Sequence, residues 1–99
     1  MLYVGGLASY QIVYTNKMKR DLKRVRKRGK DVNKLTKILS LLALRHPLPE
    51  IYNDHQLKGP LKEYRECHIE PDWLLLYQII DKELILYATG TGTHSDLFE

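Results

Sequence analysis

Residues 73–80 read Trp-Leu-Leu-Leu-Tyr-Gln-Ile-Ile and residues 83–89 read Glu-Leu-Ile-Leu-Tyr-Ala-Thr, with only Asp81-Lys82 between them. The first run is apolar almost without interruption, which is typical of a strand buried on both faces. Two polar residues between two such runs predict a tight hairpin. We therefore expect this hairpin to form the centre of a sheet.

The residues before the hairpin predict another strand. Leu61–Glu70 alternates, with His68 and Glu66 on one face and Cys67 and Arg65 on the other, as the period of a strand requires. Proline favours turns, so the following Pro71-Asp72 is expected to be the turn into the hairpin.

The first half of the chain predicts one strand and two helices. Tyr10–Tyr14 is β-branched and aromatic, and Lys17–Arg28 carries a narrow apolar stripe at helical spacing. A second helix with a wide apolar face is expected from a cap at Asp31 to Leu44, where the prolines of residues 46–49 end it. Helices followed by strands predict an α+β fold, with two helices on one side of a mostly antiparallel sheet.

Length and composition limit the kinds of protein that the chain can be. Its 99 residues, 43% of them hydrophobic, suffice for one domain, expected over residues 10–99 after a loose extension at residues 1–9. No apolar run approaches the ~20 residues of a membrane-spanning helix, and no secretory signal is expected. Cys67 is the only cysteine, which excludes an intrachain disulfide and favours the reducing cytoplasm.

Positive charge is concentrated in one segment. Residues 17–37 contain eleven Lys or Arg and two acidic residues, whereas residues 38–99 contain five basic and ten acidic residues. A segment of one sign favours a nucleic acid or another polyanion as partner. A solvated helix face explains the charge alone equally well. The basic residues of the first helical segment and the turn after it are Lys17, Lys19, Arg20, Lys23, Arg24, Arg26, Lys27, Arg28 and Lys30.

Four polar side chains in the second half are candidates for proton-transfer chemistry. Histidine takes and gives protons near neutral pH, and a carboxylate is a natural partner for it. Taken singly, each candidate is more simply a surface or turn residue. The candidates are His55, His68, Asp72 and His94, accompanied by the aromatic residues Trp73 and Phe98.

Two other chemistries are disfavoured by spacing. The histidines and Cys67 lack the close pairs that zinc sites use, so no metal or other cofactor is expected. Cys67 should point away from His68 on the same strand, which argues against a Cys–His nucleophile. The Gly-Thr stretch of residues 90–93 has no following lysine and is not a phosphate-binding P-loop. We expect Thr93 to cap a short terminal helix that reaches Phe98.

Three motifs occur here in a characteristic order. They are Asp54-His55, then Tyr-Arg-Glu-Cys-His-Ile-Glu-Pro-Asp-Trp at residues 64–73, and Gly-Thr-His-Ser-Asp-Leu-Phe at residues 92–98. From Tyr10 to Phe98 the chain resembles the YafQ-type toxins of the RelE superfamily of bacterial toxin–antitoxin systems. The resemblance implies helices on a curved sheet of four to five strands, with a short C-terminal helical turn. It also implies an mRNA endonuclease that works in the ribosomal A site and is held inactive by a cognate antitoxin.

The resemblance places the catalytic site on His55, His68, Asp72 and His94. Cleavage of RNA by its own 2′-OH needs a base, an acid and positive charge at the phosphate. Asp72, assisted by His55 or His68, is expected near the 2′-OH, and His94 is expected to protonate the leaving oxygen. Phe98 is expected to stack on a base, with Trp73 beside the site.

One position departs from the family. An arginine usually stands four residues before the last histidine and holds the phosphate, but here that residue is Gly90. Either other cations compensate, or the Gly-Thr repeat is an insertion that shifts the register. The candidates are Lys58, Lys62 and Arg65, although alternation puts Arg65 on the face opposite His68.

The departure leaves an alternative function open. A weakened toxin fold would act as a binding module that forms a DNA-binding repressor with its antitoxin. In either case the expected partners are the antitoxin, the ribosome with its mRNA, and operator DNA only through the antitoxin, with no membrane. The basic segment is expected to contact ribosomal RNA or an acidic antitoxin.

Overall fold

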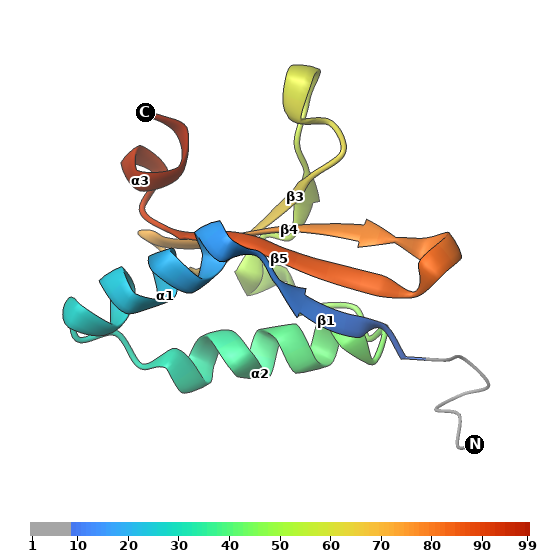
Figure 1. Cartoon of the computed structure of the whole chain (residues 1–99), viewed down its shortest axis with the longest axis horizontal. Coiled ribbons are helices and arrows are strands. Elements are labelled where there is room, and N and C mark those ends of the chain that lie inside the picture. Colours follow the sequence, from blue (N-terminus) through green and yellow to red (C-terminus); the bar gives the residue numbers. More distant parts are fainter. Residues whose placement is uncertain (1–8) are drawn as a thin grey trace.

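The computed structural model describes residues 9–99, which form a five-stranded sheet with the two main helices on one side and a short C-terminal helix on the other (Figure 1). The sheet order is β1-β5-β4-β3-β2, with β1 parallel to β5 and all other neighbours antiparallel. The predicted α+β fold is confirmed, and the extension predicted at residues 1–9 lies, apart from Ser9, outside the described residues. The elements are β1 (Gln11–Tyr14), α1 (Asn16–Lys27), α2 (Val32–Ala43), β2 (His55–Gln56), β3 (Arg65–Glu70), β4 (Trp73–Ile80), β5 (Ile85–Gly92) and α3 (His94–Phe98).

The central hairpin forms as predicted, but its turn differs. β4 is buried over most of its first half, which confirms a strand covered on both faces there. The two-residue connection is wrong, because Asp81–Glu83 forms a 3-10 turn and Leu84 adopts a left-handed conformation with φ 54°. β5 therefore starts at Ile85, and it extends to Gly92 rather than ending at Thr89.

The strand predicted over residues 61–70 is shorter than expected. Gly59–Leu61 forms a 3-10 turn, since Pro60 cannot donate a ladder hydrogen bond, and the strand begins only at Arg65. A two-residue strand that the sequence did not predict, β2, pairs with it through His55 and Glu66.

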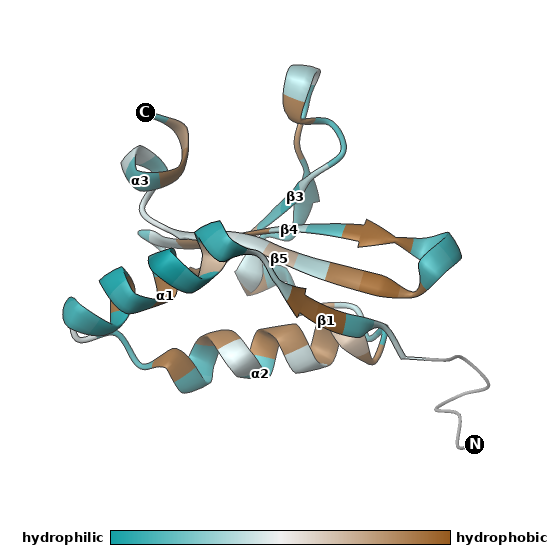
Figure 2. Ribbon diagram, viewed as in Figure 1, coloured by the Kyte–Doolittle hydropathy of each residue, from teal (hydrophilic) through white to brown (hydrophobic). Residues whose placement is uncertain are grey.

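Both main helices begin and end at the expected signals. The Thr15 hydroxyl accepts a hydrogen bond from Met18 N at 3.1 Å, and Asp31 accepts one from Asn33 N at 3.0 Å. After α1, Gly29 takes the left-handed conformation, with φ 84°, that a helix stop favours. α1 is hydrophilic over most of its length, whereas α2, β1 and parts of β4 and β5 carry many apolar residues (Figure 2).

A single core lies between α2, the inner face of α1 and one face of the sheet. Its members share nearly complete burial, which supplies most of the stabilisation of a small domain. Among residues 9–99, no helix is long and apolar enough to cross a bilayer. The most buried side chains are Trp73, Tyr77, Met18, Leu35, Ile38, Leu39, Leu75, Leu86 and Val25.

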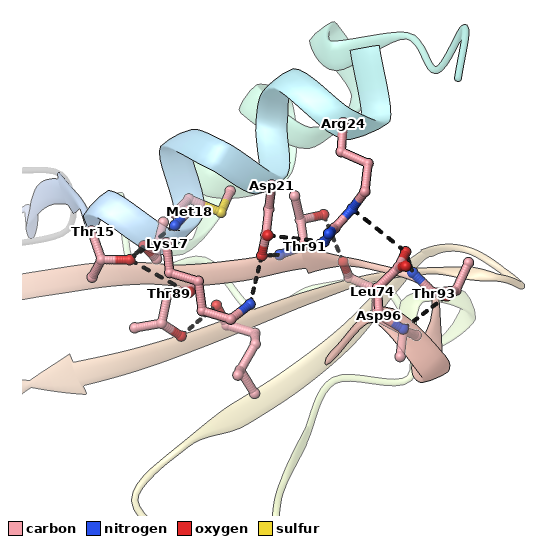
Figure 3. Close-up of polar contacts among 12 residues, drawn as sticks. Thr15, Lys17, Met18, Asp21, Arg24, Leu74, Thr89, Thr91, Thr93 and Asp96 are labelled. Atoms are coloured by element: carbon pink, nitrogen blue, oxygen red, sulfur yellow. Dashed lines mark hydrogen bonds and ion pairs between the residues drawn. The ribbon is translucent and has the colours of Figure 1, made fainter. Parts of the chain in front are cut away.

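α1 also covers the outer edge of β5. β1 ends at Tyr14, opposite Ala88, so the rest of β5 would present an unpaired edge. The buried Asp21 carboxylate fills this gap by accepting a hydrogen bond from Thr91 N at 3.1 Å (Figure 3). The helix is thereby fixed beside the last half of β5.

We predict that Thr91→Val destabilises the fold by about 1–3 kcal/mol, because it leaves buried polar groups without partners. The Thr91 hydroxyl is fully buried, accepts a hydrogen bond from Trp73 Nε1 at 2.8 Å and donates one to Leu74 O at 2.7 Å. Urea unfolding measures the change. The exposed Thr36→Val is the control, and equal losses in both variants would contradict the prediction.

We predict that Glu70 makes stability depend on acid pH. Hydrogen bonds from Lys30 and then Lys34 lower the pKa of Glu70 from 4.5 to about 2. Because the folded state binds fewer protons than the unfolded state in this window, stability falls as the pH drops from 4.5 to 2. Glu70→Gln should lose less stability over that range than wild type in thermal unfolding, whereas the exposed Glu63→Gln should follow wild type.

Candidate functional site

The sheet face away from α1 and α2 carries two rows of paired residues. The first row runs His55, Glu66, Leu76 and Gly90 across β2, β3, β4 and β5, and the second runs His68, Leu74 and Gly92. Directly paired residues on neighbouring strands point to the same side. We call this side the open face. Figure 1 shows α3 and the segment between β2 and β3 both rising from it.

Glu66 joins two of the predicted site histidines. Its Oε1 lies 3.6 Å from His55 Nε2 and 3.7 Å from His68 Nε2, and the residue is only 8% exposed. The other ring nitrogen of His55 lies 2.7 Å from Asn53 O, and that of His68 lies 3.4 Å from Pro71 O. Each imidazole therefore lies between a backbone carbonyl and the Glu66 carboxylate, which is within ion-pair distance of a protonated ring.

Sequence reasoning did not single out Glu66. The alternation of β3 placed it on the same face as His68, which was the available signal. The pairing of Glu66 with His55 could not be read from the sequence, because it depends on the unpredicted strand β2.

His94 and Phe98 lie on α3, directly after β5. Thr93 caps this helix as predicted, and Asp96 completes a capping box by accepting from Thr93 N at 2.8 Å. The rings of His94 and Phe98 are 4.9 Å apart and tilted by 45°. Gly92 is required here, because a Cβ on it would lie 2.6 Å from Asp96 Oδ2.

The open face thus holds two separate groups of site residues. His68 and Gly92 occupy one row two strands apart, which corresponds to a backbone separation of about 10 Å. His94 follows Gly92 by two residues. Glu66 with its two histidines therefore lies on the β3 side of β4, and α3 with His94 and Phe98 follows β5 on the other side of β4.

Asp72 stands apart from the histidines. It is an exposed turn residue that lines a cavity of about 80 Å³ with Arg28, Lys30, Gly92 and Thr93. Among residues 9–99 it makes no hydrogen bond or ion pair with His55, His68 or His94. The structure brings it near the start of α3 rather than near Glu66.

Trp73, expected beside the site, is a core residue, as its place in the apolar run of residues 73–80 predicted. The residue is 1% exposed and packs on the helix side of the sheet, with Lys30 Nζ 5.9 Å from its ring centre. A bulge between His68 and Glu70 shifts the register beside it, which alternation could not predict. Trp73 therefore lies on the helix side of the sheet, opposite to the open face.

The three cations expected to compensate for Gly90 are Lys58, Lys62 and Arg65, and their positions differ. Arg65 Nη2 pairs with Asp54 at 3.2 Å and its Nε donates to the buried Tyr77, which places it on the opposite side from His68, as alternation predicted. Lys58 and Lys62 are exposed residues of the segment between β2 and β3.

The basic residues of α1 and of its C-cap, Arg28, divide into two arcs. The inner arc faces acidic partners: Lys17 and Arg24 contact Asp21, and Arg28 pairs with Asp96 at 2.5 Å. The pKa of Asp96 is lowered, mainly by this hydrogen bond from Arg28. The outer arc is exposed and forms no ion pair within the described part of the chain; it consists of Lys19, Arg20, Lys23, Arg26 and Lys27.

Cys67 is a core residue. It is fully buried between its neighbours on the helix side, and burial raises the pKa of its thiol to about 12. A thiol in this state is a poor nucleophile. Within residues 9–99 no three His, Cys, Asp or Glu side chains are grouped so as to hold a metal ion.

Known proteins resemble this chain over nearly its whole length. The mRNA interferase toxin YafQ of Escherichia coli K12 is 46% identical over 88 residues, which cover 88% of this chain and 94% of that protein. YafQ in the E. coli DinJ-YafQ toxin-antitoxin complex is 43% identical, with a TM-score of 0.83 over 92% of this chain and 99% of that one. A metal-bound toxin from Helicobacter pylori is 45% identical, with a TM-score of 0.85 over 90% and 99%.

A family model agrees with these relatives. The model for YafQ, the bacterial toxin of a type II toxin-antitoxin system, matches residues 10–99. The resemblance seen in the three sequence motifs is thereby confirmed. This chain belongs to the YafQ family of bacterial toxins of type II toxin–antitoxin systems.

Proposed function

We propose that the protein is an endoribonuclease that cleaves mRNA in the A site of the ribosome, acts in the cytoplasm and is neutralised by a cognate antitoxin. The observation that carries the proposal is the open face, where His55 and His68 share Glu66 on one side and His94 with Phe98 stands on the other. The E. coli relative is an mRNA interferase, which supports this activity.

The proposed reaction is attack of the ribose 2′-oxygen on the adjacent phosphorus. The proton of the 2′-OH is removed, as the new P–O bond forms, by Asp72 near the start of α3, and His55 or His68 beside Glu66 assists from the other side of the bound ribose. The bond from phosphorus to the 5′-oxygen breaks, and His94 gives that oxygen a proton. The products are a 2′,3′-cyclic phosphate and a 5′-hydroxyl, and hydrolysis of the cycle gives a 3′-phosphate. No metal or other cofactor takes part.

Phe98 is proposed to position the nucleotide. It lies 4.9 Å from the His94 ring, so a base stacked on Phe98 would bring its phosphate close to the acid. Base–aromatic stacking tolerates any sequence, because every base has a π face. Codon preference is then left to neighbouring contacts.

The outer arc is proposed to bind the ribosome or the antitoxin. Its five cations have no acidic partner among residues 9–99, so they are available to phosphates or to acidic side chains. A partly disordered antitoxin segment that orders on binding would suit such an extended surface. The complex of the E. coli relative with DinJ supports an antitoxin partner.

One observation favours a second candidate function. Gly90 brings no side chain to the phosphate side of the open face, and loss of a charged donor typically costs a hydrolytic enzyme about 10²–10³ in rate. A chain weakened in this way would serve as a binding module that forms a DNA-binding repressor with its antitoxin. The two functions differ in whether the isolated chain cleaves mRNA.

We predict that His94→Ala and Asp72→Ala each reduce cleavage of ribosome-bound mRNA by about 10²–10⁴, the usual contribution of an acid or base. The measurement is single-turnover cleavage of a defined message on purified ribosomes. His46→Ala is the control, because His46 is an exposed residue of the loop after α2, outside the open face.

The result for wild type separates the two candidates. Cleavage by wild type that both site variants lose would support the endoribonuclease. An inactive wild type that binds its antitoxin and operator would support the binding module. Site variants that keep full activity while their folds persist would contradict the proposed catalytic roles.

A further inference from the structure

A side chain on residue 90 would find its place already taken by a lysine. An ideal Cβ on Gly90 would lie 3.1 Å from Lys17 Nζ, 3.0 Å from Leu97 Cδ2 and 3.3 Å from Asp21 Oδ2. The first of these atoms is an ammonium nitrogen. The space vacated by the missing side chain therefore contains a positive charge from α1.

This space belongs to the open face. Gly90 pairs with Leu76, which pairs with Glu66, so a Cβ on Gly90 would point to the same side as the Glu66 carboxylate and His55. Leu97 of α3 lies against the same space. The Lys17 ammonium thus lies at the β5 end of the row whose other end carries His55.

The ammonium is both fixed and accessible. It lies 2.7 Å from Asp21 Oδ2, and Asp21 is itself held by Thr91 N and by Arg24 at 2.9 Å (Figure 3). The Lys17 side chain is nevertheless 47% exposed. An ammonium has three donors, so one bond to Asp21 leaves two for an incoming anion.

The other nearby cations are directed elsewhere. Arg24 reaches Asp21 and Asp96, and Arg28 pairs with Asp96. Arg65 is held by Asp54 and Tyr77 on the far side of the sheet. Of the basic residues on α1, Lys17 is the one whose charged atom lies at the position of a side chain on the open face.

We propose that Lys17 binds the scissile phosphate and takes the place of a cation on β5. This inference rests on the proposed endoribonuclease function. It adds to the site a residue of α1 that is distant in the sequence from His55, His68 and His94. The Nζ donates to a non-bridging oxygen and stabilises the charge that builds up on the phosphate during attack. Asp21 is a positioning residue that holds Lys17 against β5.

The first test removes the charge at residue 17. Lys17→Ala and Lys17→Gln should each slow single-turnover cleavage of ribosome-bound mRNA by roughly ten- to hundredfold, since a donor to the transition state is lost. Lys17→Arg should retain most activity. Lys82→Ala is the charge-matched control, because Lys82 lies in the turn at the far end of the β4–β5 hairpin (Figure 1).

The second test returns a cation to β5. Gly90→Arg alone should add little, because its side chain must share the space with Lys17 and displace the flexible end of Leu97. In a Lys17→Ala chain the same arginine should recover most of the lost rate. Such non-additivity is expected only if the two side chains serve one position. Equal effects of Gly90→Arg in both backgrounds would overturn the assignment.

A binding measurement separates a phosphate contact from a change in fold. The probe is a ribosome-bound message with a 2′-deoxyribose at the cleavage position, which cannot react. Lys17→Gln should bind it more weakly than wild type at a temperature where circular dichroism shows both proteins folded, whereas Lys17→Arg, which keeps a cation beside Asp21, should bind as wild type does. Equal binding and equal cleavage by Lys17→Gln would refute the role of Lys17.

The outcomes distinguish this inference from the proposed function. If wild type cleaves and His94→Ala does not, but both Lys17 variants cleave normally, the Lys17 assignment alone is wrong. If wild type cleaves no ribosome-bound mRNA, the endoribonuclease function is wrong and the role of Lys17 falls with it.

Discussion

The carboxylate of Asp21 fixes the geometry on which the rest of the site depends. It is almost fully buried and accepts hydrogen bonds from Thr91 N, Lys17 and Arg24. Burial of a charge is costly unless it is paired and hydrogen-bonded, and here the partners satisfy it. The same contact covers the β5 edge beyond β1 and holds α1 in place. The start of α3 is tied to that helix through Arg28 and Asp96.

Most of the architecture could be predicted from the sequence, because it depends on local signals. The apolar periodicities of α1 and α2, their caps at Thr15 and Asp31, and the apolar run of β4 all have short-range physical causes. The errors lie where tertiary pairing overrides local pattern. Leu84 adopts a left-handed conformation that leucine rarely takes. β2 has only two residues, too few to show the alternation of a strand.

The site could be predicted in its residue types but not in its arrangement. Proton-transfer chemistry suggested the three histidines and Asp72, and family resemblance joined them. The shared contact with Glu66 requires the register between β2 and β3, and the position of Lys17 requires the packing of α1 against β5. Strand register and helix docking both depend on contacts between segments that are distant in the sequence, so no single stretch predicts them.

The two arcs of α1 differ in how strongly their residues are constrained by the rest of the structure. Inner-arc residues have partners at fixed distances, so a shift of one position along the helix would break contacts with Asp21 or Asp96. Outer-arc residues are constrained only by their charge. Lysine and arginine can therefore exchange there, or move to a neighbouring exposed position, without disturbing the sheet or α3. Substitutions can thus accumulate on the outside of α1 while the geometry of the open face stays constant.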